Sequence, residues 1–280
     1  MIVIQTVREM QVEADRLRSE GKRIGFVPTM GFLHEGHMSL IRVAKQQSYV
    51  TVVSIFVNPT QFGPKEDFFE YPRDFQRDER LCRQEGVDIL FNPSESEMYP
   101  EGHLSHVDVD VITDRLCGAS RPGHFRGVTT VVAKLFLAVK PHLAVFGQKD
   151  AQQVAVIRKM VRDLNFDVSI IIAPIIREPD GLAMSSRNVY LSPEERADAL
   201  VLNQSLQKAE SMIRRGERKT VTIIRAMEDL IRTKKQAKID YIEVVDPDTL
   251  RPIATVESKA LIALAVFVGK TRLIDNLIVE

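Results

Sequence analysis

The chain has 280 residues, 44% of them hydrophobic and 27% charged, which is the composition of a folded globular protein rather than of a disordered or fibrous one. Its 38 basic residues balance 38 acidic residues, so no overall positive field exists to hold a nucleic-acid backbone. A small ligand is favoured instead, and it can still be an anion held by a local cluster of donors.

The first part of the chain alternates helical and strand-like patterns. Thr6 and Glu9 have the capping-box spacing, in which each side chain is expected to satisfy a backbone donor at the start of a helix that stops at Gly21. Residues 23–28 follow as a buried strand. Further helices are expected over residues 36–47, 73–84, 128–139 and 150–164, and further strands over 49–57, 88–91, 143–146 and 167–173. This order predicts βαβ units and an α/β fold with a Rossmann-like, doubly wound parallel sheet.

The rhythm changes after Ile176. Ser192, Pro193 and Glu195 predict the start of a long helix, and a second helix is expected over residues 220–235. Three strand-like runs follow over residues 239–245, 260–268 and 273–279 with no helix between them, so we expect antiparallel strands. The sequence therefore predicts a Rossmann-like domain over residues 1–176 and a smaller α+β domain, acting as a lid, over residues 177–280.

The cysteines and the apolar runs indicate the cellular compartment in which the protein is expected to lie. Cys82 and Cys117 lie 35 positions apart with no second pair, which excludes a thiolate zinc site and makes a disulfide framework improbable. Met1 is not followed by the pattern of a signal peptide. The longest apolar runs, residues 168–176 and 260–269, are about half the roughly 20 residues that a membrane-spanning helix needs. We therefore expect a cytoplasmic protein with no membrane partner.

Residues 28–37 (PTMGFLHEGH) lie between the first strong strand and the helix after it, at the edge where open α/β sheets bind ligands. Gly31 and Gly36 permit a close backbone approach, and the free amides of a helix start favour an anion such as phosphate. His34 and His37 are three residues apart, so both imidazoles are expected to face one phosphate group. Each histidine alone is more often an ordinary solvated residue, and a zinc site needs a spacing of four.

Four ordered segments together carry a resemblance to a known family. The first is HEGH at residues 34–37, which is similar to the nucleotide-binding signature of the nucleotidylyltransferase superfamily. The others are FVNPTQF at 56–62, FGQKDAQQ at 146–153 and DGLAMSSRN at 180–188. With these spacings the chain closely resembles the pantothenate synthetase (pantoate–β-alanine ligase) family over nearly its whole length.

The resemblance implies ATP-dependent ligation of pantoate to β-alanine through a pantoyl adenylate, with release of pyrophosphate and AMP. His37, His34 and Lys149 are then the expected catalytic residues, with His37 as the principal donor. The implied ATP-binding residues are Pro28, Thr29, Met30, Gly31, Phe32, Leu33, His34, Glu35, Gly36, His37, Gly147, Gln148, Lys149, Asp150, Ile176, Met184, Ser185, Ser186 and Arg187.

Two glutamines are implied to hold the acid. By resemblance Gln61 and Gln153 bind pantoate, and Gln61 also contacts β-alanine. A neutral amide orients a carboxylate without the charge pairing that makes it a poorer nucleophile. On the residues alone, each glutamine is an ordinary polar surface residue.

Other features of the sequence depart from the family pattern or allow more than one interpretation. Gln148 and Ala151 depart from the Glu and Tyr of the family pattern, which puts any role of these two side chains in doubt. Arg121 is a candidate phosphate contact in a basic loop. The acidic stretch 71–79 is able to support a metal-bound water, although a helix surface is the commoner meaning of such charges.

The resemblance implies Mg²⁺ with ATP, with its protein ligands unknown, and a homodimer. Three alternative functions use similar residues: a nucleotidylyltransferase acting on a phosphorylated acceptor, a class I aminoacyl-tRNA synthetase, and a nucleotide-binding regulator without turnover. The first needs extra cations, and the second needs a basic domain for which the chain has no room. Pyrophosphate exchange distinguishes the third.

Overall fold

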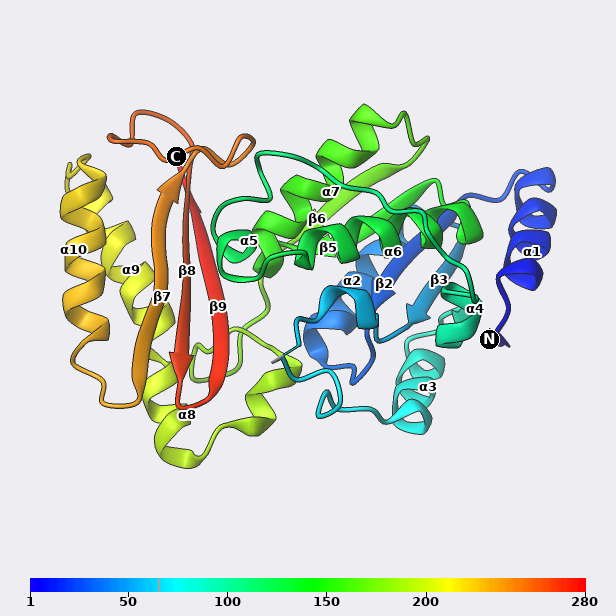
Figure 1. Cartoon of the computed structure of the whole chain (residues 1–280), viewed down its shortest axis with the longest axis horizontal. Coiled ribbons are helices and arrows are strands. Elements are labelled where there is room, and N and C mark those ends of the chain that lie inside the picture. Colours follow the sequence, from blue (N-terminus) through cyan, green and yellow to red (C-terminus); the bar gives the residue numbers. More distant parts are fainter. Residues whose placement is uncertain (65) are drawn as a thin grey trace. The chain divides into compact units, whose positions relative to one another are not determined.

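The computed structural model describes residues 1–64 and 66–280, and these divide into two compact units (Figure 1). The first unit comprises residues 1–110, 121–147 and 156–174, and the second comprises residues 111–120, 148–155 and 175–280. No helix in the described part of the chain has the length and apolar character that a bilayer crossing requires.

The first unit contains a parallel sheet. Its strands are β1 (Ile2–Ile4), β2 (Ile24–Thr29), β3 (Val50–Ile55), β4 (Ile89–Phe91), β5 (Leu143–Gly147) and β6 (Ser169–Ala173). Its helices are α1 (Val7–Ser19), α2 (Glu35–Gln47), the 3₁₀ turn η1 (Pro59–Gln61), α3 (Phe75–Gln84), α4 (Glu95–Met98) and α6 (His124–Val139). Helix α7 (Ala151–Asp163) follows β5 and ends in this unit. The described strands lie in the order β1-β4-β3-β2-β5-β6, and every pairing is parallel.

Apolar side chains on both faces of this sheet explain its buried strands. Because successive strand residues point to opposite faces, Val27 and Phe26 belong to different layers. Val27 packs with Ile41 of α2 in one cluster. On the other face, the ring of Phe26 meets that of Phe136 of α6 edge-on, with centroids 6.4 Å apart. Helices on both faces of a parallel sheet confirm the predicted doubly wound, Rossmann-like α/β class.

The second unit contains an antiparallel sheet, as predicted. Its strands are β7 (Ala237–Val245), β8 (Ala260–Val268) and β9 (Thr271–Val279), in the order β7-β8-β9. Its helices are α5 (Cys117–Ser120), the 3₁₀ turn η2 (Gln148–Asp150), the 3₁₀ turn η3 (Ser186–Tyr190), α8 (Pro193–Ala199), α9 (Val201–Arg214) and α10 (Thr220–Ile231). Leu206 of α9, Met227 of α10 and Leu264 of β8 share one buried cluster, so both helices pack on the sheet (Figure 1).

The two predicted helix starts differ in their caps. Ser192 and Glu195 form a reciprocal capping box, with N–H to oxygen distances of 3.2 and 2.9 Å, but that helix breaks at Leu200 into α8 and α9. At the first helix the Thr6 hydroxyl accepts the Glu9 N–H and donates to the Glu9 carboxylate at 2.7 Å. The carboxylate therefore binds the hydroxyl and not the Thr6 backbone donor that we expected.

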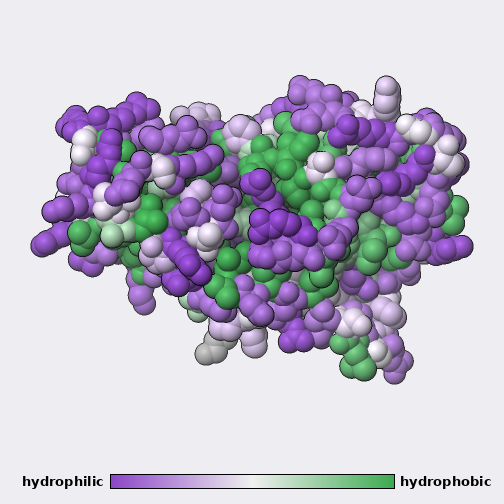
Figure 2. All heavy atoms as spheres, turned by 90° about the horizontal axis from the view of Figure 1, so that it is seen from above, coloured by the Kyte–Doolittle hydropathy of each residue, from purple (hydrophilic) through white to green (hydrophobic). Residues whose placement is uncertain are grey.

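Hydrophilic side chains cover most of the face in Figure 2, and hydrophobic residues appear between them. Scattered apolar residues of this kind are normal for a protein surface. Large apolar side chains that are exposed among the described residues include Phe69 in the first unit and Val221 in the second. This face therefore gives no separate indication of function.

Candidate functional site

The strand order of the first unit places a switch point between β2 and β5. The chain runs outward from β2 to β3 and β4, and it then returns to the other side of β2 as β5. In open α/β sheets, ligands bind outside the carboxyl ends of the strands at such a point. Strand β2 ends at Thr29 and β5 ends at Gly147, so two of the segments singled out from the sequence begin at this edge.

The loop between β2 and α2 is turned sharply and held by its neighbours. Gly31 and Phe32 have φ angles of 83° and 48°, in the left-handed region where a residue other than glycine is strained. The Thr29 hydroxyl accepts the Gly31 N–H at 3.1 Å and donates to the Ser54 carbonyl at 2.7 Å. The loop is therefore fixed to both β2 and β3 before α2 begins at Glu35.

A buried carboxylate supports the loop from below. Asp78 of α3 is 1% exposed and accepts the backbone N–H groups of Phe32 at 2.6 Å and Leu33 at 2.7 Å. Burial raises the pKa of Asp78, although these two donors act in the opposite direction. The two hydrogen bonds satisfy the amides of a strained segment, and Asp78 is therefore a positioning residue for the loop that ends at His34.

Asp78→Asn is expected to destabilise the protein by about 1.5–3 kcal/mol. The amide oxygen still accepts one of the two backbone N–H groups, but the amide NH₂ then faces the other N–H, which is left without an acceptor. The turnover number should fall while the KM for each substrate changes less, since the loop loses its position rather than a substrate contact. Urea unfolding and steady-state kinetics measure the two effects. Glu79→Gln, on the same helix at a more exposed position, is the matched control. Wild-type stability and turnover in Asp78→Asn would refute this role.

His34 and His37 lie together at the start of α2. His34 is the N-cap residue, and the centroids of the two imidazole rings are 4.1 Å apart. His37 Nδ1 accepts the backbone N–H of His34 at 3.3 Å. With Nδ1 as an acceptor, the proton of a neutral His37 is on Nε2, which is thereby a hydrogen-bond donor. The helix start and this donor both favour an anion at this place.

Gln61 reaches the same loop. It ends η1, just after β3, and its side chain is buried. Its Oε1 accepts from the Asn58 amide at 3.2 Å, and its Nε2 donates to Met30 Sδ at 2.8 Å. A thioether is a weak acceptor, so this donor gives up little when it turns to a carboxylate or hydroxyl.

An ion pair fixes the backbone of Gln61. Arg121 and Glu66 form a bidentate pair through Nε and Nη2, both with nitrogen–oxygen distances of 2.6 Å, and the same Nη2 also donates to Gln61 O at 3.3 Å. His124 Nδ1 lies 2.8 Å from the same carbonyl oxygen. Burial acts to raise the pKa of Glu66, and Arg121 outweighs it, so this pKa lies below its ordinary value. Arg121 therefore holds the η1 turn in this structure, and the phosphate contact considered from the sequence stays a prediction.

Helix α6 packs directly against the backbone of the η1 turn. A Cβ added at Gly127 would lie 2.6 Å from the carbonyl carbon of Thr60 and 2.7 Å from Gln61 Cα, and both of these are backbone atoms. Such distances are too short for non-bonded atoms, so only glycine fits without a shift of one element. The Gly127 carbonyl also accepts from the Asn58 amide at 3.1 Å.

In the second unit, η2 is fastened to β9. The Asn276 amide donates to the carbonyl oxygens of Gln148 and Lys149, both at 2.9 Å, and its Oδ1 accepts from the Gln148 side chain at 2.9 Å. Gln148, which departs from the family pattern, thus has a structural partner. Lys149 lies 3.4 Å from the Asp150 carboxylate and keeps 21% of its side-chain area exposed.

Gln153 and its neighbour Gln152 differ in their surroundings. Gln153 lies in the first turn of α7 and is partly exposed. Gln152 is buried, accepts the Cys117 N–H at 2.9 Å and donates to the carbonyl of Arg115 at 2.7 Å. Gln152 is therefore committed to the packing of residues 111–120.

Residues 176–188 form a hairpin whose two arms are joined by backbone contacts. The Met184 N–H donates to the Ile176 carbonyl at 3.0 Å, and Arg177 pairs with Ala183 as an isolated bridge. Gly181 has a φ of 96° at the turn, where an added Cβ would lie 2.6 Å from the Asn203 amide nitrogen. This glycine makes a tight turn in the structure, and the expectation from the sequence that it lets the segment swing stays a prediction.

An ion pair fixes the hairpin to β9, and a local hydrogen bond caps the 3₁₀ turn η3 that follows. Arg177 forms a bidentate ion pair with Asp275 of β9, at 2.7 and 3.0 Å, and Asp275 is 1% exposed. Beyond the turn, Ser185 caps η3 by accepting the Arg187 N–H at 3.3 Å. Ser186 is buried, whereas Ser185 and Arg187 are partly exposed.

The supporting residues Asp78, Glu66, Asn276 and Asp275 were not found from the sequence. For Asp78 a signal existed: it lies between Phe75 and Cys82 on the face of α3 that packs against the sheet, where a carboxylate needs a partner. Glu66, Asn276 and Asp275 carry no such signal, because each meets a partner 55 or more positions away.

Comparisons with known proteins give a consistent result. The family model described as Pantoate-beta-alanine ligase matches residues 2–278. A pantothenate synthetase from Caldicellulosiruptor bescii is 60% identical over 280 residues, which is all of this chain and 99% of the relative. The crystal structure of pantothenate synthetase from Thermus thermophilus is 46% identical, with a TM-score of 0.94 and 99% of both chains covered. A pantoate-beta-alanine ligase from Francisella tularensis, solved in complex with beta-gamma ATP and beta-alanine, is 37% identical, with a TM-score of 0.82 and 99% and 97% of the two chains covered.

Proposed function

The chain belongs to the pantoate-beta-alanine ligase family, and from this premise we propose the route and the residue roles of its reaction. The enzyme condenses pantoate with β-alanine using ATP. In the first step a pantoate carboxylate oxygen attacks the α-phosphorus of ATP. The bond from that phosphorus to the bridging oxygen of the β-phosphate breaks, and pyrophosphate leaves with the electron pair.

In the second step the β-alanine amine attacks the acyl carbon of the pantoyl adenylate. The acyl carbon–oxygen bond breaks, AMP leaves with the electron pair, and the amine loses one proton. Neither step needs a protein nucleophile. The enzyme therefore acts by positioning the reactants and by stabilising charge that grows on phosphate oxygens.

The first unit orients the acid and neutralises the phosphate charge. The observation that supports this best is the pair of imidazoles, 4.1 Å apart at the start of α2, beside the loop that the Gln61 amide contacts. His37 Nε2–H is the principal donor to the developing phosphate charge, and His34 assists it. Gln61 binds pantoate and later β-alanine through a neutral amide, which leaves the carboxylate nucleophilic.

The second unit supplies nucleotide contacts and the other acid contact. Lys149 donates to phosphate oxygens, Ser185, Ser186 and Arg187 bind the β- and γ-phosphates, and the Ile176 backbone contacts adenine. Gln153 binds pantoate together with Gln61. Because Asn276 fixes the carbonyls of η2, the backbone at Lys149 is preorganised for its role.

Mg²⁺ accompanies ATP in this reaction. Among the described residues, no three His, Cys, Asp or Glu side chains gather as a metal site. Mg²⁺ is usually held by substrate phosphates, water and one or two carboxylates rather than by an all-protein cage. Asp150, beside Lys149, is the carboxylate available to hold it. When bound, the ion supplies charge neutralisation at the phosphates. We also infer that the protein acts in the cytoplasm as a homodimer.

The reaction is tested by mixing enzyme, ATP, Mg²⁺, pantoate and β-alanine. AMP should form only when both organic substrates are present. Pantoate labelled with ¹⁸O in its carboxylate should transfer one labelled oxygen to AMP, because that oxygen becomes the bridge of the adenylate. Release of ADP and phosphate instead would contradict attack at the α-phosphorus. Pantoate-dependent exchange of pyrophosphate into ATP separates this enzyme from a nucleotide-binding protein without turnover.

A further inference from the structure

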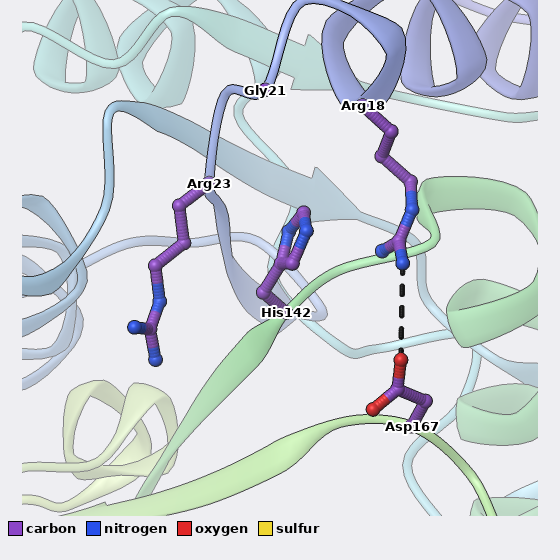
Figure 3. Close-up of a pocket in the computed structure, with 5 residues that line it drawn as sticks. All are labelled: Arg18, Gly21, Arg23, His142 and Asp167. Atoms are coloured by element: carbon purple, nitrogen blue, oxygen red, sulfur yellow. Dashed lines mark ion pairs between the residues drawn. The ribbon is translucent and has the colours of Figure 1, made fainter.

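A polar pocket lies at the edge of the first unit's sheet opposite to the candidate site. Its volume is about 360 Å³, and its lining residues are Arg18, Gly21, Arg23, His142 and Asp167 (Figure 3). They come from the end of α1, the turn before β2, and the positions just before β5 and β6. Because parallel strands begin at one edge, the fold brings these segments together. With a rise of roughly 3.3 Å per residue, the length of β2 separates this edge from the loop at His34 by about 20 Å.

His142 is a fixed donor in this pocket. Its Nδ1 accepts the Ile24 N–H at 3.0 Å, so the proton of the neutral ring is on Nε2. Burial, with the positive charges of Arg18 and Arg23, lowers the pKa of His142, and this favours the neutral ring. The ring lies between the Arg18 and Arg23 side chains in Figure 3.

The two arginines provide the positive charge. Within residues 1–64 and 66–280, no carboxylate forms an ion pair with Arg23. Arg18 donates to the Lys140 carbonyl at 2.8 Å, and another of its nitrogens lies 3.9 Å from Asp167, whose side chain is fully exposed. An exposed pair at this distance contributes little, so an incoming anion can replace the Asp167 carboxylate at small cost.

We propose that this pocket binds a small organic phosphate. Two guanidinium groups and an imidazole line one pocket, with the arginine side chains on either side of the ring in Figure 3, and planar guanidinium donors match the oxygens of phosphate. The pocket volume is at the lower end of the range for small-molecule sites, which leaves room for an organic part beside the phosphate. No part of the ligase reaction uses these residues, so the site is separate from the one described above.

The probe for this site is glycerol 3-phosphate, with glycerol as its uncharged counterpart and inorganic phosphate as its bare headgroup. Binding is followed on the full chain by the imidazole ring signals of His142 in NMR spectra, which are assigned from the signal missing in His142→Gln. Glycerol 3-phosphate should shift the His142 signal in a saturable way and leave those of His34 and His37 in place. It should bind more tightly than inorganic phosphate, and glycerol should cause no shift.

Substitutions test the charges. Arg23→Gln should weaken binding of glycerol 3-phosphate by roughly tenfold or more, because a hydrogen bond to a charged group is lost. Asp167→Asn should strengthen it, because the competing carboxylate is removed. Arg8→Gln, on the exposed side of α1, is the matched control and should bind as wild type does. Arg23→Gln should also keep wild-type ligase turnover.

Three results would overturn the proposal. The first is no saturable shift of His142. The second is an affinity that neither Arg23→Gln nor Asp167→Asn changes, since the anion then binds elsewhere. The third is equal affinity for inorganic phosphate and glycerol 3-phosphate, which removes the organic part from the recognised ligand.

Discussion

His37→Ala is expected to slow formation of the pantoyl adenylate by about 100-fold or more. In the proposed mechanism His37 Nε2–H donates to a phosphate oxygen and stabilises the additional charge that develops there in the transition state. The KM for ATP should change far less than the turnover number. Rapid-quench measurement of pantoate-dependent adenylate formation in a single turnover isolates this step from product release.

The substitution also removes a helix cap, because His37 Nδ1 accepts the His34 N–H. His37→Gln separates the two roles, since glutamine at the third helical position is itself a capping residue. We expect His37→Gln to recover thermal stability but not the rate. His106→Ala, at an exposed position of the first unit, is the control for loss of an imidazole. Recovery of the rate in His37→Gln would show that His37 serves the helix and not the chemistry.

Asp275→Ala is expected to destabilise the second unit by about 3–5 kcal/mol, because it leaves the Arg177 guanidinium without its buried partner. Asp275 is 1% exposed, so water cannot take the place of the lost carboxylate. The effect is measured by urea unfolding, with attention to whether the two units unfold together. The same change should raise the KM for ATP if the hairpin over residues 176–188 binds the nucleotide.

Two variants give this prediction its controls. Glu210→Ala removes the partner of Arg214 in an exposed pair on α9 and should cost no more than about 1 kcal/mol. The double substitution Arg177→Met with Asp275→Leu removes both charges and should recover much of the stability. A loss of under about 1 kcal/mol in Asp275→Ala would mean that the pair does not hold the hairpin.

The alternation of strands and helices was predictable because it depends on local pattern. Residues 23–28 and 49–57 are apolar enough to be buried strands, and Ser192 with Glu195 marks a helix start by side-chain chemistry alone. The exceptions were also local. β1 has three residues, which are too few for a hydrophobic period to be recognised. At the break between α8 and α9 the residue is Leu200, and no glycine or proline stands there to signal it.

The candidate site was predictable only where a motif carries the chemistry. The proximity of His34 and His37 was predictable, because their spacing and their position after β2 are both visible in the sequence. The residues that hold them and Gln61 in place were not readable, because those contacts join distant parts of the chain. Asp78 meets Phe32 across 46 positions, and Arg121 meets Glu66 across 55. Such pairs exist only after the fold has formed.

With Gln61 in its proposed role of binding the acid, the contact at Gly127 limits how the acid specificity of this enzyme can be re-engineered. Helix α6 leaves no room there for a methyl group against the backbone that carries Gln61. Enlarging the η1 turn to admit a bulkier acid would cause a steric clash between the turn and α6. The whole helix would then have to shift. Libraries aimed at new acids should therefore keep Gly127 and vary side chains that do not bear on that turn.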